Sequence, residues 1–208
     1  MQQQTQGQTA TGTIMPSNTM QQQMKHGGHE VFEAHEVLSG LISLSDQYLL
    51  LGQQVQDQEL KSIFSRQQQF MLGEYNVMVE AFSSGQDPSK PTSQYKMNQD
   101  NDVVYGLKPS KPKKPAMATT EINDECICNM MACAVKATAS QLTIASLETT
   151  NPVLRRVFAD SIPNFIEMAY EIFLYQNKKH YYQVPQLAAQ DMNQMIGSFT
   201  TMNQTQLQ

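Results

Sequence analysis

Apolar residues recur at helical spacing along four long stretches of the chain. The most regular stretch follows Asn151, a favourable N-cap residue, and Pro152, which suits the first helical position because no partner is lost with its N–H. Its apolar positions are Leu154, Val157, Phe158, Ile162, Phe165, Met168, Ala169, Ile172 and Phe173. This spacing predicts a helix with one broad buried face, kinked or restarted at Pro163.

The same spacing predicts three earlier helices. Residues 29–55 and 58–83 are two such stretches with a short joint, at which Asp57 would cap the second helix, so we expect an antiparallel hairpin. A third helix is predicted over 121–149, directly before the helix that Asn151 begins. Its predicted inward positions are Ile122, Glu125, Cys126, Met130, Cys133, Ala137, Ile144 and Leu147.

Residues 85–119 differ in composition from these helices. The segments GQDPSKPTSQY and GLKPSKPKKPAM are rich in Pro, Lys and Ser, which favours an extended, polyproline-like chain. A connection of this length is unusual inside a compact domain, so it is expected to be a crossover or a functional arm. Two hairpins joined by one long crossover form the ferritin-like arrangement. The sequence therefore predicts an all-α, ferritin-like four-helix bundle over residues 26–192.

Both ends of the chain are polar and almost uncharged. Residues 1–25 and 193–208 are dominated by Gln, Thr, Met and Asn, and they cannot bury enough apolar surface to offset the entropy of ordering. We therefore expect two disordered tails. Their glutamines, together with accessible lysines, suggest amide cross-linking as a hypothesis that rests on composition alone.

Composition excludes several classes of partner. The net charge is −5 and no long run has one sign, so neither nucleic acid nor an anionic membrane is indicated. No apolar run reaches the ~18 residues of a membrane-spanning helix. The N-terminus lacks the basic and apolar regions of a secretory signal, so we expect synthesis in the cytoplasm.

The three cysteines argue against a disulfide framework because they are few and odd in number. On a helix, Cys126 and Cys133 share a face but lie ~10 Å apart along the axis, beyond disulfide reach and beyond one metal's coordination sphere. We predict that both fill the core, and that at least one of the three thiols is exposed.

A ferritin-like bundle raises the question of a di-metal site. The carboxylate form of that site needs Glu-x-x-His from two helices, and this sequence contains no Glu-x-x-His. His35, Glu74 and Glu125 occupy polar positions within apolar stripes, so they are the candidate metal ligands if the bundle holds one. The alternative, which we favour, is a buried hydrogen bond or ion pair that fixes the helix register. We expect no catalytic residues and no cofactor.

Six segments carry a family resemblance: GGHEVFEAHEVLSGLI, DQELKSIF, QFMLGEYN, GQDPSKP, DVVYGL and, above all, NPVLRRVFADSIPNFIEMAYEIFLYQNKKHYYQVPQL. Together they resemble the spore coat protein F (CotF) family of endospore-forming bacteria, over roughly residues 25–192. The resemblance implies a ferritin-like bundle in the protein coat of the spore, made in the mother cell. It also implies other coat proteins as partners and no settled enzymatic activity, while the sequence leaves open whether the chain forms a homo-oligomer. The alternative function is metal or oxidant handling at a degenerate site within the bundle.

Overall fold

The computed structural model describes residues 26–202, most of which lie in five α-helices. The helices are α2 (Gly28–Gly52), α3 (Gln58–Ser84), α4 (Asp124–Glu148), α5 (Pro152–Lys178) and the short α6 (Ala189–Ile196), and a 3₁₀ turn, η1 (Thr119–Glu121), precedes α4. Within the described range there is no β-strand, only an isolated parallel bridge between Tyr105 and Val184. For these residues the all-α prediction is confirmed.

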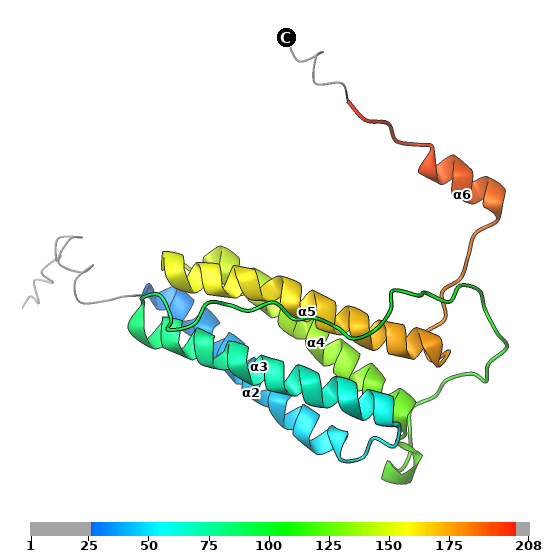
Figure 1. The fold of residues 1–208 in the computed structure, drawn as a ribbon, viewed down its shortest axis with the longest axis horizontal. Coiled ribbons are helices and arrows are strands. Elements are labelled where there is room, and N and C mark those ends of the chain that lie inside the picture. The colour runs from blue at the N-terminus through cyan, green and yellow to red at the C-terminus, as the bar shows by residue number, and fades with distance from the viewer. Residues whose placement is uncertain (1–25, 203–208) are drawn as a thin grey trace, which may run out of the picture.

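The four long helices pack around one core (Figure 1). Helices α2 and α5 each contact both α3 and α4. The Asp124 carboxylate, at the start of α4, accepts hydrogen bonds from the backbone N–H groups of Gln56 (2.9 Å) and Asp57 (2.8 Å). Helix α4 therefore begins at the α2–α3 joint, and each long helix runs antiparallel to both of its neighbours. None of the helices in residues 26–202 is long and apolar enough to cross a membrane.

Helices α3 and α5 match the predicted pattern closely. Asp57 caps α3 by accepting from the N–H groups of its first turn, and Asn151 caps α5 in the same way. The buried apolar positions of the two helices include Leu60, Ile63, Phe64, Met71, Met78, Leu154, Phe158, Phe165, Met168 and Ile172. Full burial of one such side chain contributes about 1.5–3 kcal/mol, so these stripes supply much of the stability of the fold.

Pro163 does not restart helix α5, so of the two predicted outcomes, a kink or a restart, the restart is wrong. The helix runs without a break from Pro152 to Lys178, and Pro163 lies on its exposed face. The missing N–H of Pro163 removes one helical hydrogen bond, that to the carbonyl of Ala159, a partly exposed residue.

The predicted inward face of the third helix is wrong. In α4 the buried residues are Ile127, Cys128, Met131, Ala132, Val135, Thr138, Leu142 and Ala145. Cys133 is exposed and Cys126 is partly exposed, so neither is the core residue that was predicted, although one exposed thiol was expected. Ala, Met and Cys occur on several faces of this helix, and spacing alone therefore does not single out the face that meets the core.

The crossover connects opposite ends of the group of four long helices. It leaves the C-terminal end of α3 and follows α5, as the green trace beside the yellow and orange helix in Figure 1 shows, until it reaches η1 and α4. Helix α6 stands away from the bundle and spans the predicted tail boundary at residue 192. The predicted tail at 1–25 and the end of the other tail, 203–208, lie outside the described residues.

Candidate functional site

The three candidate metal ligands do not form one cluster. His35 is exposed on α2, with its ring edge-on to that of Phe82 at a centroid distance of 6.0 Å. Glu125 lies in the first turn of α4, at the end of the bundle where α2 finishes. The helical residues from His35 to Gly52 alone span about 25 Å, so His35 and Glu125 cannot share an ion. Within residues 26–202, no three His, Cys, Asp or Glu side chains are grouped so as to hold a metal.

The predicted inward position of His35 is wrong because the buried face of α2 is turned slightly from the predicted one. Its core residues are Ala34, Val37, Leu41, Leu44 and Tyr48. Val31 and Leu38, the apolar residues on either side of His35 in the predicted stripe, are only partly buried. His35 therefore faces solvent at the edge of the α2–α3 contact.

Glu74, in contrast, is buried, with 1% of its surface exposed. Its carboxylate accepts hydrogen bonds from the Ser93 backbone N–H (3.2 Å) and hydroxyl (3.0 Å). It also accepts from the Asn164 amide (3.4 Å). The Ser161 hydroxyl oxygen lies 3.1 Å from the carboxylate and 2.8 Å from the Val157 carbonyl, and its one proton serves one of these two acceptors at a time. A carboxylate has about four lone-pair sites, and protein donors occupy at least three of those of Glu74. Glu74 thus fits the buried hydrogen-bond alternative better than a role as metal ligand.

A second buried carboxylate, Glu171 on α5, lies in a larger polar cluster that sequence reasoning did not identify. It forms an ion pair with Arg66 and accepts hydrogen bonds from Gln67 (3.0 Å), the Tyr95 hydroxyl and the Asn98 backbone N–H (3.1 Å). The available signal was its position three residues after Met168, on the predicted buried face of the helix. Four protein donors thus occupy the lone-pair sites of Glu171.

Two tyrosines in this cluster act as hydrogen-bond donors. Tyr48 donates to the Gln67 side chain, and Tyr95 donates to Glu171. Burial raises the pKa of the Tyr48 hydroxyl well above its ordinary value. Burial, and then the hydrogen bond to Glu171, raise the pKa of the Tyr95 hydroxyl. Both phenols therefore stay protonated and keep donating throughout the physiological pH range.

Polar side chains of α5 bind the backbone of the crossover along residues 93–104, which we call the strap. Asn164 accepts from the Tyr95 N–H (2.9 Å), while Asn177 binds both the N–H (2.6 Å) and the carbonyl (2.9 Å) of Val104. Glu171 holds the strap between these two points. The donors and acceptors of an extended chain need partners when they pack on a helix, and side chains supply them here. The strap is thereby fixed to the bundle.

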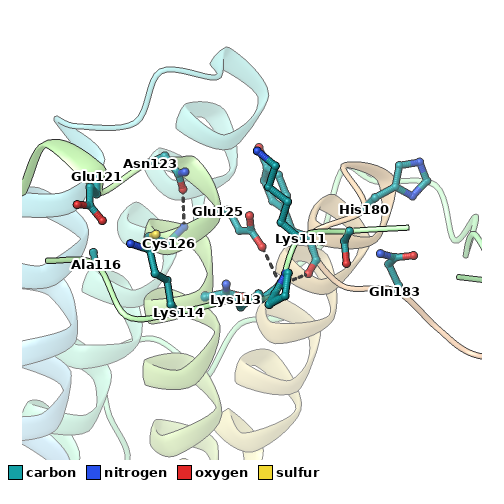
Figure 2. A pocket seen from close by; sticks show the side chains of 14 residues that line it. Lys111, Lys113, Lys114, Ala116, Glu121, Asn123, Glu125, Cys126, His180 and Gln183 are labelled. Atoms are coloured by element: carbon teal, nitrogen blue, oxygen red, sulfur yellow. Dashed lines mark hydrogen bonds and ion pairs between the residues drawn. The ribbon is translucent and has the colours of Figure 1, made fainter. Parts of the chain in front are cut away.

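Beyond the strap, the basic part of the crossover encloses an open cavity of about 640 Å³ (Figure 2). Its walls come from residues 110–116 of the crossover, which we call the basic arm, from the start of α4 and from the chain after α5. They include Lys111, Lys113, Lys114, Glu121, Glu125, Cys126, Asn129, His180, Tyr181 and Gln183. The Lys113 ammonium binds the Glu125 carboxylate (2.7 Å) and the Tyr181 carbonyl (2.8 Å), which holds the arm over the cavity. The cavity presents charges of both signs to a polar ligand or partner chain.

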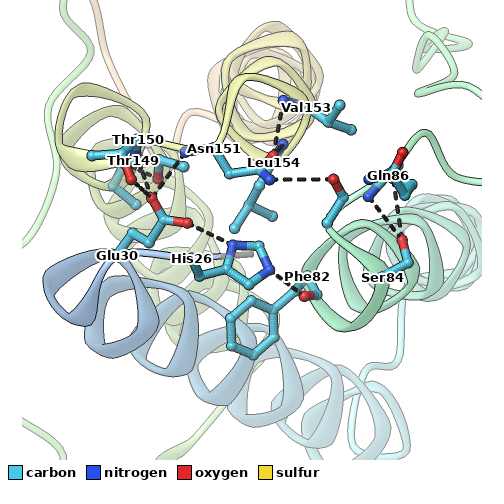
Figure 3. Close-up of polar contacts among 12 residues, drawn as sticks. His26, Glu30, Phe82, Ser84, Gln86, Thr149, Thr150, Asn151, Val153 and Leu154 are labelled. Atoms are coloured by element: carbon cyan, nitrogen blue, oxygen red, sulfur yellow. Dashed lines mark hydrogen bonds and ion pairs between the residues drawn. The ribbon is translucent and has the colours of Figure 1, made fainter. Parts of the chain in front are cut away.

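A third buried carboxylate, Glu30, joins the helix ends opposite the cavity (Figure 3). It accepts from the Thr150 N–H and hydroxyl, from the Asn151 N–H (2.9 Å) and from His26 (2.5 Å). The other ring nitrogen of His26 lies 2.5 Å from the Phe82 carbonyl, at the end of α3. Burial alone would raise the pKa of Glu30, but the hydrogen bonds, led by that from Thr150, lower it below its ordinary value.

Two comparisons with known proteins point to the same protein family. The family model of the Coat F domain matches residues 123–185, which include α4 and α5. The chain is also 54% identical over 173 residues to the spore coat protein F-like protein YhcQ of Bacillus subtilis (strain 168). That match covers 83% of this chain and 80% of the relative. No solved structure matches the chain.

Proposed function

The chain belongs to the spore coat protein F family, and from that membership we propose that it is a structural component of the spore coat. The observation that carries the proposal is the 54% identity, over 83% of the chain, with a relative named as spore coat protein F-like. In this proposal the protein is made in the mother cell, resides in the coat, assembles with other coat proteins and catalyses no reaction.

The buried carboxylates support a structural role. Glu74 and Glu171 use most of their lone pairs to hold the strap and to join α3 with α5, which disfavours a role as ligands of a metal or a substrate. Metal handling, the alternative expected from the sequence, gains no support, because His35 and Glu125 lie at different ends of the bundle. A bundle tied in this way offers coat proteins a surface of fixed shape.

We further infer that the bundle has the ferritin-like arrangement. Three features support this inference: two antiparallel hairpins, four helices that surround one core, and a crossover that connects opposite ends of the bundle. An experimental structure in which α2 and α4 ran parallel, or in which the crossover returned to the end it left, would contradict it.

We propose that the cavity beside the basic arm is one contact site for a coat partner. It is open, its lysines are accessible, and it carries charges of both signs, as the polar rim of a protein interface does. A photo-cross-linking residue at Lys114 tests this, with the same residue at Arg156, exposed on α5, as the matched control. Adducts with coat proteins from position 114 and not from position 156 are expected. Equal yields, or none from position 114, would contradict the contact.

Localisation of the full-length chain tests the proposed function itself. A fluorescent fusion expressed during sporulation should form a ring around the forespore, and the chain should remain in spore coats after washing with salt. A mother-cell enzyme expressed from the same promoter is the control and should wash out. Diffuse fluorescence in the mother cell, together with absence from washed coats, would overturn the proposal.

A further inference from the structure

Helix α4 presents a second apolar face to solvent. While its inner face packs in the core, the outer face carries the exposed residues Met130, Cys133, Ala137, Ser140, Ile144 and Leu147. The exposed fraction reaches 57% for Ile144 and 79% for Leu147. Single exposed apolar side chains are ordinary, but a continuous stripe of them along a helix is typical of an interaction surface.

The stripe has the spacing of a coiled-coil seam. One heptad series contains Cys126, Cys133, Ser140 and Leu147, and a second series, offset by four residues, contains Met130, Ala137 and Ile144. Alternating steps of four and three place all seven residues, which we call the outer seam, along one line of the helix. The outer seam is about 32 Å long. Between its ends the only charged residue is Lys136, which is not part of it.

We propose that the chain forms a homodimer in which two copies pack their outer seams against each other. A face without charges needs a partner face that is also without charges over the same length, and the outer seam of a second copy meets this requirement. Ala137 and Ser140, near its middle, are small and allow the two helices to approach closely, while Met130 and Ile144 supply apolar contact on either side. Pairing of one surface with itself gives a closed, two-fold dimer.

Helix α6 is the competing occupant, because its Met195 and Ile196 are also exposed. It has eight residues and is about 12 Å long, so it could cover only about a third of the outer seam. A second α4, of 25 residues, covers all of it. The proposal goes beyond the proposed function, because the dimer forms in solution whether or not the chain resides in the spore coat.

Sedimentation analysis of the full chain tests the dimer, with Ile144→Glu as the probe. Its matched control is Ile166→Glu on α5, since Ile166 has the same exposed fraction of 57%. Over about 1 to 100 µM we expect the unsubstituted chain and the control to approach twice the 23.4 kDa chain mass. Ile144→Glu should dissociate at least about tenfold more readily, because it places an unpaired carboxylate in the seam.

Three results would overturn the proposal. These are a monomer at every concentration, a dimer that Ile144→Glu leaves intact, and a dimer that Ile166→Glu disrupts equally. Dissociation by Met195→Gln/Ile196→Gln, with Ile144→Glu still dimeric, would also overturn it in favour of an interface built by α6. Leu147→Glu, at the most exposed position of the seam, repeats the test in case Ile144→Glu lowers helix content, which circular dichroism would detect.

Discussion

The Tyr95 hydroxyl donates a hydrogen bond to the buried Glu171 carboxylate and so joins the crossover to the C-terminal half of α5. The two residues are 76 positions apart in sequence. Tyr95 is itself almost completely buried, and its ring lies edge-on to that of Phe70 on α3. The crossover therefore contributes a side chain to the core of the bundle, and the strap is as much a part of the fold as the four long helices.

Replacing Tyr95 with Phe should destabilise the protein by about 1–3 kcal/mol. The ring contacts remain, but the buried Glu171 carboxylate loses one of its four donors. Urea unfolding followed by circular dichroism measures the change. Tyr105→Phe, at an exposed tyrosine further along the crossover, is the control and should change stability by less than about 0.5 kcal/mol. Equal effects of the two substitutions would show that the hydrogen bond to Glu171 contributes little.

Glu74→Gln should destabilise the fold more than Glu80→Gln, although both carboxylates lie on α3 and bind a serine of the crossover. Glu74 is buried and binds Ser93, whereas Glu80 binds Ser89 (2.8 Å) where water can replace it. A Gln at position 74 would point its amide N–H donor toward other donors, which should lower the free energy of unfolding by about 1.5–3 kcal/mol. Limited proteolysis should then cut near Ser93 sooner in Glu74→Gln than in Glu80→Gln. Similar cleavage rates would contradict this account of the strap.

Divalent iron, manganese and zinc should leave the thermal unfolding midpoint unchanged. Protein donors occupy most lone pairs of Glu74 and all four of Glu171, and His35 and Glu125 are too far apart to bind one ion together. Differential scanning calorimetry with each metal, and with a chelator, is the measurement. An upward shift that disappears in Glu74→Gln would restore metal binding as a candidate function, since a ligand that binds only the folded state raises its stability.

Cys128 should resist thiol reagents in the folded protein. It is fully buried, and burial raises the pKa of its thiol to about 11. At pH 8 the thiolate is therefore about a hundredfold scarcer than for a free cysteine. In a Cys126→Ser/Cys133→Ser variant, which retains Cys128 alone, labelling should be slow in buffer and fast in urea. Fast labelling in buffer would place Cys128 outside the core.

The sequence predicted α3 and α5 well and α4 poorly, for a physical reason. In α3 and α5, charged and amide residues separate the apolar positions, so only one face can be buried. Helix α4 has a single charged residue, Lys136, between Cys126 and Leu147, and both its faces satisfy the same spacing rule. Contacts with α2 and α5, which spacing does not encode, decide which face is buried.

The polar cluster was harder to predict than the helices. Glu74 was identified because it interrupts an apolar stripe, but Glu171 and Glu30 were not. Several partners of these two acids come from positions more than 100 residues away, such as Arg66 for Glu171 and Thr150 for Glu30. No local pattern indicates such pairings. An acidic residue in the first turn of a helix, such as Glu30, is ordinarily exposed and interacts favourably with the helix dipole.

Glu30→Gln should make the protein less stable at neutral pH and remove part of its acid sensitivity. The pKa of Glu30 is below its ordinary value of 4.5 in the folded protein, so folding favours the ionised carboxylate. The stabilisation is therefore fully present above pH 4.5 and is lost as the pH falls through the lower, folded-state pKa.

At pH 7 we expect the free energy of unfolding of Glu30→Gln to be about 1.5–3 kcal/mol below that of the unsubstituted chain, because Glu30 accepts several buried hydrogen bonds. Urea unfolding at a series of pH values should show this difference shrinking as the pH falls below 4.5. The control is Glu36→Gln, at an exposed position of the same helix, which should change the free energy of unfolding very little at any pH. A difference that stayed constant with pH would mean that Glu30 stabilises the junction through packing and not through its charge.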